Sequence, residues 1–273
     1  MVLDYFVLIF YIYIMTNKTK QHLDTAIATS QFRFGDYISR GFELWKEQAG
    51  LYIAFGILMM VVTGVIGLIP IVGAVVNQII VSPLLVAGAY IFTHKLANKE
   101  RPEFGAFFDV TEHAGKIISL YAIYALLMVA LIAPLFLMMD FNMDVLSGDG
   151  EAVLEMFENT SPLILLAAIP LVIISFAIAY ASQFIIFYKL SIVDSVKYSA
   201  KFFFKHPVMF FFYFIVVGLI AISGIIGLCV AILITYSMLF PMAYTPFRHI
   251  TQLAQYESGD NDNDVYDSLV EVI

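Results

Sequence analysis

The chain has 273 residues, of which 61% are hydrophobic and 13% charged, and its formal net charge is −8. Soluble domains carry about 25% charged residues, so this composition excludes an ordinary soluble globular protein and indicates that lipid surrounds most of the chain. The single cysteine, Cys229, excludes an intrachain disulfide framework and a cysteine-built metal site.

The first predicted element is a short apolar segment, residues 1–14, which Asp4 interrupts. It is too short to span a bilayer comfortably, and no small-residue cleavage site of a signal peptide follows it. We therefore expect residues 1–31 to be an N-terminal extension and a cytoplasmic segment, with Met15 as the natural initiator.

Six membrane spans are predicted next. Residues 49–93 carry no charge, and as one helix they would measure about 68 Å, twice the hydrocarbon thickness of a bilayer. Two helices with a turn near Gly64–Gly73 fit instead. Spans three and four are expected at about 117–139 and 163–187, and spans five and six share 207–247. The sequence predicts an all-α membrane domain over 32–250 and an acidic cytoplasmic tail over 251–273.

An internal repeat relates spans one and two to spans five and six. The stretch TGVIGL at Thr63–Leu68 returns as SGIIGL at Ser223–Leu228, and the charged segment that begins at Asp36 matches the one that begins at Asp194. The stretch SPLLVAGAY also matches FPMAYTPF, which places Pro83 against Pro241. These three matches occur in the same order, each 158 or 160 residues apart. This spacing favours a parallel duplication of a helical hairpin around a central pair of spans.

The distribution of basic residues predicts the orientation. All 14 Lys and Arg residues lie before span one, between spans two and three, between spans four and five, or after span six. The 140–162 loop carries only acidic charges. Because basic loops stay in the cytoplasm, both termini should face the cytoplasm, with the acidic loop outside.

Three lysines form the main candidate lipid site. Lys197, Lys201 and Lys205 recur at i, i+4 and i+8 on one face of an amphipathic helix that leads into span five. Such a helix lies in the membrane interface with its ammonium groups among anionic headgroups. The matching lead-in, Gly35–Gln48, places Ile38, Phe42 and Trp45 on one face. Ordinary topology anchoring explains the same lysines without specific lipid binding.

Polar side chains within the spans form a second candidate site. Asn77 and Gln78 lie in span two, and Gln183 lies in span four. Unpaired amides in hydrocarbon are costly, so these amides should meet one another or water. Two interpretations stay open, a pathway for a substrate or ion and a set of hydrogen bonds that hold helices together.

Metal and enzyme sites are weakly indicated. The five histidines do not pair at helical spacing, and no phosphate-cradling, nucleophile-elbow or HExxH motif is present, so we expect no cofactor, no metal and no nucleic-acid partner. The acidic side chains Glu151, Glu155 and Glu158 share a helical face that is either solvated or holds a divalent cation. The tail from Asp260 to Glu271 has calcium-loop spacing but Val265 in place of the usual glycine, which favours a disordered acidic tail.

Several stretches resemble a group of bacterial six-span membrane proteins of unknown function: FRFGDYISRGFELWKEQAGLYIAF, IPIVGAVVNQIIVSPLLVAGAYI, FGAFFD and GLIAISGIIGLCVAILITYSMLFPM. That group is similar to the membrane domain of some glycerophosphodiester phosphodiesterases and is often labelled β-carotene monooxygenase. The resemblance covers roughly residues 32–250 and implies the six-span fold, without supplying an active residue. The oxygenase label implies histidines clustered on iron, and this sequence lacks such a cluster.

Three functional hypotheses follow. The first is a non-catalytic envelope accessory or scaffold protein that engages membrane lipids, with other membrane proteins as further candidate partners. The second is a permease or channel-like carrier that uses the intramembrane amides. The third is a membrane-bound oxygenase of an apolar substrate.

Overall fold

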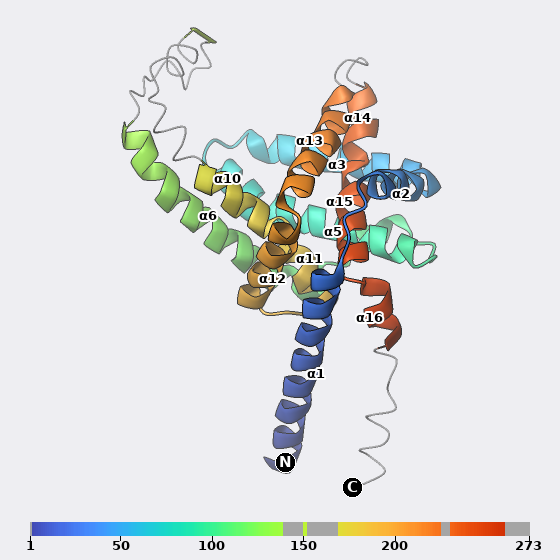
Figure 1. Ribbon diagram of the computed structural model, residues 1–273. Coiled ribbons are helices and arrows are strands. Elements are labelled where there is room, and N and C mark those ends of the chain that lie inside the picture. The colour runs from blue at the N-terminus through green and yellow to red at the C-terminus, as the bar shows by residue number, and fades with distance from the viewer. Residues whose placement is uncertain (1, 139–149, 152–168, 225–229, 260–273) are drawn as a thin grey trace.

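The computed structural model describes residues 2–138, 150–151, 169–224 and 230–259, and every regular element in these ranges is helical (Figure 1). The α-helices are α1 (Val2–Thr29), α2 (Phe34–Glu47), α3 (Ala49–Gly67), α4 (Val72–Val76), α5 (Ser82–Ala97), α6 (Ala114–Met138), α10 (Ile169–Ile178), α11 (Ala181–Tyr188), α12 (Ile192–Lys205), α13 (Pro207–Ser223), α14 (Val230–Ser237), α15 (Leu239–Ile250) and α16 (Leu253–Gly259). A π-helix, η1 (Asn77–Val81), joins α4 to α5, and two 3₁₀-helices, η2 (Phe104–Phe108) and η3 (Thr111–His113), precede α6. The predicted all-α class is confirmed for these residues.

Several of these helices are long and apolar enough to cross a membrane. Within the described residues they cover Ala49–Gly67, Val72–Ala97, Phe104–Pro134 and Ile169–Tyr188. The pair α12 and α13, bent by 93°, makes a fifth if it is counted as one span. The predicted turn between spans one and two is confirmed, because α3 ends at Gly67 and α4 begins at Val72.

The region predicted as spans five and six is divided into shorter helices. Helix α13 has 17 residues, α14 has eight and α15 has 12. Helices α13 and α14 lie side by side in Figure 1. Pro241 lacks the N–H that would bond to the Ser237 carbonyl. Helix α14 therefore ends at Ser237, and α15 begins separately at Leu239. By length, these helices fall short of two further spans.

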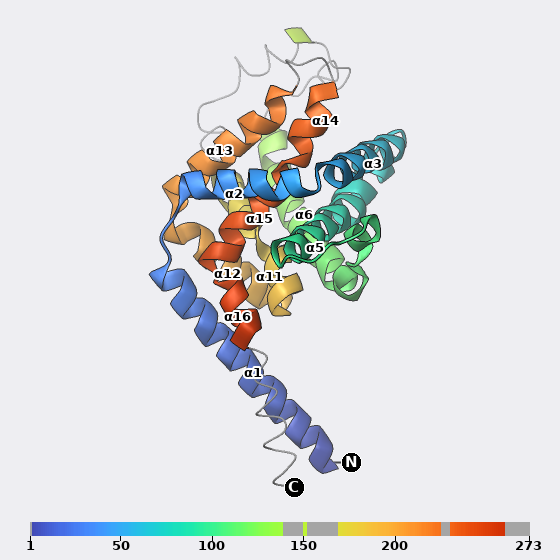
Figure 2. The same ribbon diagram turned by 90° about the vertical axis from the view of Figure 1, so that its right-hand side faces the viewer.

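Helix α1 is a departure from the sequence prediction, which placed no helix before residue 32. It has 28 residues and extends away from the body of the protein in Figures 1 and 2. Its second half docks on α12, and Leu23, Ala26 and Ile27 on its inner face are at most 1% exposed. The polar side chains between these buried positions obscured the helical period in the sequence.

The two predicted amphipathic helices are present as α2 and α12. On α2 the buried stripe is Tyr37, Gly41 and Leu44, which packs on α15. Gly41 is required for this contact, since a Cβ there would lie 2.8 Å from a Met242 side-chain carbon. The face that the sequence singled out points elsewhere, with Phe42 40% exposed and stacked on Trp45.

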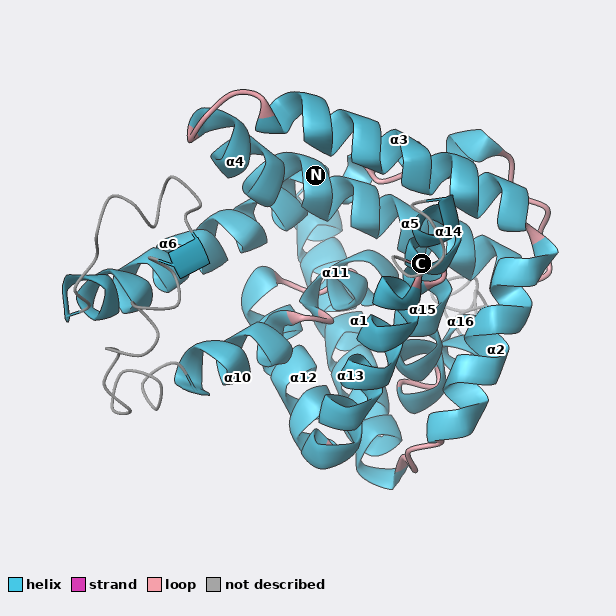
Figure 3. Cartoon of the chain, turned by 90° about the horizontal axis from the view of Figure 1, so that it is seen from above, coloured by secondary structure: helices cyan, strands magenta, loops and turns pink. Residues whose placement is uncertain are grey.

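The packing of the short helices follows one order around the protein. Element η2 packs on α5, α12 packs on α10 and α11, and α2 packs on α15. Figure 3 shows α12 next to α10. Helices α5, α11 and α15 therefore form the inner part of the fold. Each is followed by a residue with left-handed backbone, namely Lys99, Lys189 and Gln252 with φ of 63°, 51° and 51°.

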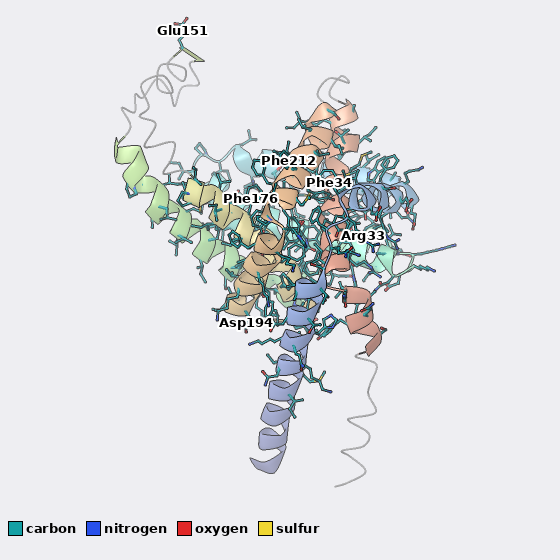
Figure 4. The ribbon with its side chains drawn as sticks, viewed as in Figure 1. Arg33, Phe34, Glu151, Phe176, Asp194 and Phe212 are labelled. Carbon is teal, nitrogen blue, oxygen red and sulfur yellow. The ribbon has the colours of Figure 1, made fainter. Side chains whose placement is uncertain are left out.

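Large apolar side chains cover much of the outer surface. Leu126 and Val129 on α6 are 72% and 65% exposed, and Leu219 on α13 is 61% exposed. Phe212, also on α13, is labelled on the outside of the bundle in Figure 4. Exposed apolar patches of this extent indicate contact with lipid or with other apolar surfaces.

Candidate functional site: a charged cleft at the end of helix α1

A cleft of about 950 Å³ opens where five helices meet. Its walls come from the end of α1, one side of α2, the C-terminal ends of α5 and α15, and α16. The lining side chains are mostly polar, in contrast to the apolar outer surface. This polarity makes the cleft a candidate binding site for a polar or charged ligand.

Helix α2 lines the cleft with a charged stripe. Asp36, Arg40, Glu43 and Glu47 follow one another at i, i+4, i+7 and i+11, so they share one face of the helix, and all four border the cleft. The neighbouring face carries the buried stripe that packs on α15. The packing of α2 on α15 thus fixes which charges point into the cleft.

Cations in the cleft are available for a ligand. The side chains of Arg33, Arg40 and Lys99 line it without an ion pair or a hydrogen bond to any described residue. Figure 4 shows Arg33 where α1 passes into α2. The carboxylates of the α2 stripe line the same cleft, so the cleft offers charges of both signs, with the guanidinium groups able to bind a phosphate or carboxylate bidentately.

A histidine and a tyrosine form the floor beside Arg33. The Tyr37 hydroxyl and His249 Nδ1 are 2.9 Å apart, and the same hydroxyl donates to the Gln31 carbonyl at 3.3 Å. Burial and then the positive charge of Arg33 lower the pKa of His249, while Asp36 opposes this shift. His249 is therefore held toward its neutral form.

A hydrogen-bonded network connects the cleft to α16. Arg248, which lines the cleft, donates to the Tyr244 hydroxyl at 3.1 Å, and that hydroxyl lies 2.6 Å from His94 Nδ1. His94 Nε2 lies 2.9 Å from the Glu257 carboxylate, to which Asn98 also donates at 3.4 Å. Because a carboxylate only accepts hydrogen bonds, Nε2 carries the proton. Sequence reasoning missed this network, since Tyr244 lies 150 residues from His94.

The pKa of Glu257 reflects this network. Burial alone would raise the pKa of its carboxyl group, but the hydrogen bond and charge of His94, the Asn98 amide and the Arg248 guanidinium together hold the pKa below its ordinary value. Glu257 is therefore ionised when α16 is docked, and it joins α16 to the end of α5.

The three predicted lipid-binding lysines lie on α12, along α1. Lys201 forms an ion pair with Asp24 at 2.6 Å, and Lys205 donates to the Ala28 carbonyl at 2.7 Å. Lys197 is exposed and has no such bond to a described residue. The structure therefore uses two of these ammonium groups to hold α1, which the sequence did not predict.

A further ion pair joins the start of α12 to α1. Lys20 lies 3.0 Å from the Asp194 carboxylate, and Ser191 donates to the same carboxylate at 2.9 Å while its hydroxyl oxygen accepts from the Asp194 N–H. Burial acts to raise the pKa of Asp194, but the Lys20 and Ser191 hydrogen bonds outweigh it and lower the pKa. Both ends of α12 are thus bound to α1.

The predicted intramembrane amides are not brought together. Asn77 accepts from Ser82 at 3.1 Å within its own helical segment, and Gln78 is exposed. Gln183 is fully buried in α11, beside the Tyr90 hydroxyl of α5 but not in a geometry that makes a hydrogen bond. The expected pairing between the amides of spans two and four is therefore absent from the described residues.

The other sequence-based candidates lie mostly outside the described residues. Within the described ranges, no three His, Cys, Asp or Glu side chains lie close enough to hold a metal ion. Glu155, Glu158 and the calcium-like tail from Asp260 fall outside those ranges. Glu151 is described, and Figure 4 shows it at the top of the view, far from Asp194.

Comparisons with known proteins assign no family to this chain. No family model, no curated protein and no solved structure matches this chain.

Proposed function

We propose that this chain is an integral membrane accessory or scaffold protein, without catalytic activity, that engages anionic lipid headgroups and membrane partners at the face formed by α1, α2 and α12. The proposal places the protein in a bacterial inner membrane with both termini in the cytoplasm. It also includes membership of the six-span group that the sequence resembles.

One observation carries the proposal. Four cationic side chains, Arg33, Arg40, Lys99 and Lys197, have no ion pair or hydrogen bond to a described residue, and all lie around the end of α1 or along its α12 neighbour. Helix α2 carries the exposed aromatic side chain of Phe42 on its other side. Unpaired cations beside exposed aromatic surface are the arrangement that interfacial helices use on anionic membranes.

Native mass spectrometry of protein released from nanodiscs that contain an anionic lipid tests this proposal. The cleft variant Arg33→Gln/Arg40→Gln/Lys99→Gln and the variant Lys197→Gln/Lys201→Gln/Lys205→Gln should each retain fewer anionic lipids than the parent protein. Arg101→Gln, at an exposed residue in the loop between α5 and η2, serves as a control for the loss of one charge outside this face and should retain as many lipids as the parent. Unchanged lipid retention in both triple variants would contradict the proposal.

A carrier is the second candidate function, which a water-filled cavity reaching Asn77 or Gln183 would favour; Gln183 is fully buried, and neither amide lines the cleft described above. Flux of small solutes into proteoliposomes, compared between the parent and Gln183→Leu, tests this candidate. No arrangement of described side chains favours the third hypothesis, an oxygenase.

The six-span count with its internal repeat is part of the proposal. Matched positions 158 residues apart support the repeat: Tyr52 and Phe210 are both fully buried, as are Phe55 and Tyr213. A second kind of match lies near the charged ends of the repeat. The hydroxyls of Thr93 and Thr251 each donate to the carbonyl four residues earlier, both at 2.7 Å.

The packing order supports extending the repeat to the central pair of spans. The chain then consists of three units, each with a short lead-in helix and two apolar segments: α2 with α3 and α4–α5, η2 with α6 and α10–α11, and α12 with α13 and α14–α15. The lead-in helix of the second and of the third unit packs on the second apolar segment of the unit before it. Helix α2 packs on α15 and so closes the ring. The left-handed residues after α5, α11 and α15 occupy matching places in the three units.

A further inference from the structure

The centre of the fold contains polar side chains in apolar surroundings. Helices α5, α11 and α15 meet there through aromatic contacts, with the Phe184 and Phe247 rings 4.9 Å apart and Phe187 4.6 Å from the His94 ring. Tyr180, the N-cap residue of α11, and Gln183 in the first turn of that helix lie three residues apart, so their side chains are neighbours. Tyr90 on α5 belongs to the same buried cluster as Tyr180, and its hydroxyl lies beside the Gln183 amide.

Three polar atoms of this cluster have no hydrogen-bond partner among the described residues. They are the Gln183 amide nitrogen and oxygen and the Tyr180 hydroxyl, on side chains that are 0% and 1% exposed. Equally buried tyrosines elsewhere are satisfied, since the hydroxyls of Tyr52 and Tyr213 bond to Thr93 at 2.8 Å and to the Met242 carbonyl at 2.7 Å. The cluster is therefore an exception to the way this protein buries tyrosine.

Leaving such groups unsatisfied is costly. A buried donor or acceptor without a partner loses its hydrogen bonds to water and gains none in return, and native interiors leave few such groups. The cost here falls at the contact between helices that form the inner part of the fold. A bound molecule that supplies the missing hydrogen bonds removes this cost.

The chemistry of the cluster defines that molecule. An amide and two hydroxyls offer donors and acceptors but no charge, and the nearest titratable groups are other tyrosines. An ion is thereby disfavoured, because burying an unpaired charge costs far more than burying a dipole. Water is the smallest neutral molecule that both donates and accepts, and a buried water typically makes about three hydrogen bonds.

We infer that Tyr90, Tyr180 and Gln183 form an internal water-binding site between α5 and α11. Water at this site bridges the Gln183 amide to the two hydroxyls and supplies the partners that the protein itself does not. A direct hydrogen bond between Gln183 and Tyr90 after a small rotation is the competing arrangement, and it leaves the site dry.

Radiolytic footprinting of the full chain in nanodiscs tests the site, because hydroxyl radicals made from bound water oxidise buried side chains next to that water. Tyr180 and Tyr90 should be oxidised several-fold faster than Tyr52 and Tyr213, which are buried with protein partners and serve as internal controls. The dry arrangement predicts equal oxidation rates at all four tyrosines, and this result would overturn the inference.

Two variants extend the test. Gln183→Leu removes the amide and should bring the oxidation rate of Tyr180 down toward that of Tyr52. Tyr180→Phe is the smaller change and keeps the test possible if the leucine variant does not fold. It should lower the oxidation rate of Tyr90. Tyr52→Phe is the matched control and should leave both rates unchanged. Undiminished oxidation at Tyr180 in Gln183→Leu and at Tyr90 in Tyr180→Phe would overturn the assignment of water to this cluster.

Discussion

Gln48 and His206 end the two amphipathic helices with nearly the same backbone, 158 residues apart. Their φ and ψ are −138° and 41° for Gln48, and −138° and 57° for His206. Each N–H bonds to the carbonyl three residues earlier at 3.2 Å, and an apolar helix begins at the next residue. The same bend thus turns a charged helix into an apolar one at both places, which suits a junction between membrane surface and membrane interior.

The contact between η2 and α5 predicts a sharp effect at Gly88. A Cβ at this position would overlap the carbonyl oxygen of Phe107, so Gly88→Ala should lower the free energy of unfolding by about 1–3 kcal/mol. Gly218→Ala on α13 is the matched control, since nothing lies within 4 Å of its added methyl group. Thermal unfolding in detergent measures both, and equal behaviour of the two variants would contradict the close packing of η2 on α5.

The sequence predicted the helices from apolar runs and charge placement, and it did so best where one helix occupies one run. Residues 49–67 and 114–138 are such cases, and both agree with the predicted spans one and three. The break between α14 and α15 and the π-helix at Asn77–Val81 were not predicted, because each depends on local backbone hydrogen bonding within an unbroken apolar run.

The candidate site was less predictable than the fold. The stripe from Asp36 to Glu47 is visible in the sequence, but the cleft exists only because α2 packs on α15, about 200 residues later in the chain. The ion pair of Lys201 with Asp24 likewise joins distant segments, 177 residues apart. Helical periodicity gives the face of a side chain but not the partner that covers it.

Trp45 is predicted to stabilise the contact between α2 and α14. Its indole N–H donates to the Ser237 hydroxyl at 2.9 Å, and removing this bond in Trp45→Tyr should cost about 0.5–1.5 kcal/mol of unfolding free energy. A double-mutant cycle with Ser237→Ala isolates the hydrogen bond, because both single variants lose it. Strictly additive effects of the two substitutions would show that the bond contributes nothing.

Glu257 predicts a dependence of stability on acid pH. Its pKa is lower in the folded protein than its ordinary value of about 4.3, so its contribution to stability is fully present above that ordinary value. It is lost as the pH falls through the lowered folded pKa. Glu257→Gln should therefore unfold more easily than the parent near neutral pH, and the difference between them should shrink in acid.

Unfolding temperatures of the parent and Glu257→Gln over a series of pH values check this prediction. Ser258→Ala, on the adjacent exposed residue, is the control and should follow the parent at every pH. A stability difference between the parent and Glu257→Gln that stays constant from neutral to strongly acid pH would rule out the proposed role of the carboxylate.

The Lys201–Asp24 ion pair is predicted to contribute little to stability. Both side chains are about half exposed, and exposed ion pairs contribute about 0.2–1 kcal/mol and weaken in salt. Lys201→Gln and Asp24→Asn should each shift the unfolding temperature only slightly, and less at high salt. A large, salt-independent loss of stability in either variant would contradict this prediction.

Site-directed labelling of single cysteines from the two sides of the membrane tests the central claim, that the chain crosses the membrane with its charged face on one side. In a Cys229→Ser background, Ser258→Cys beyond α15 and Gly150→Cys in the acidic loop are both exposed positions. An impermeant thiol reagent is applied to cells whose outer barrier has been removed and whose inner membrane is still sealed. It should label the cysteine at position 150 directly, and the cysteine at position 258 only after the inner membrane has been permeabilised. Labelling of both cysteines from the same side would contradict the account.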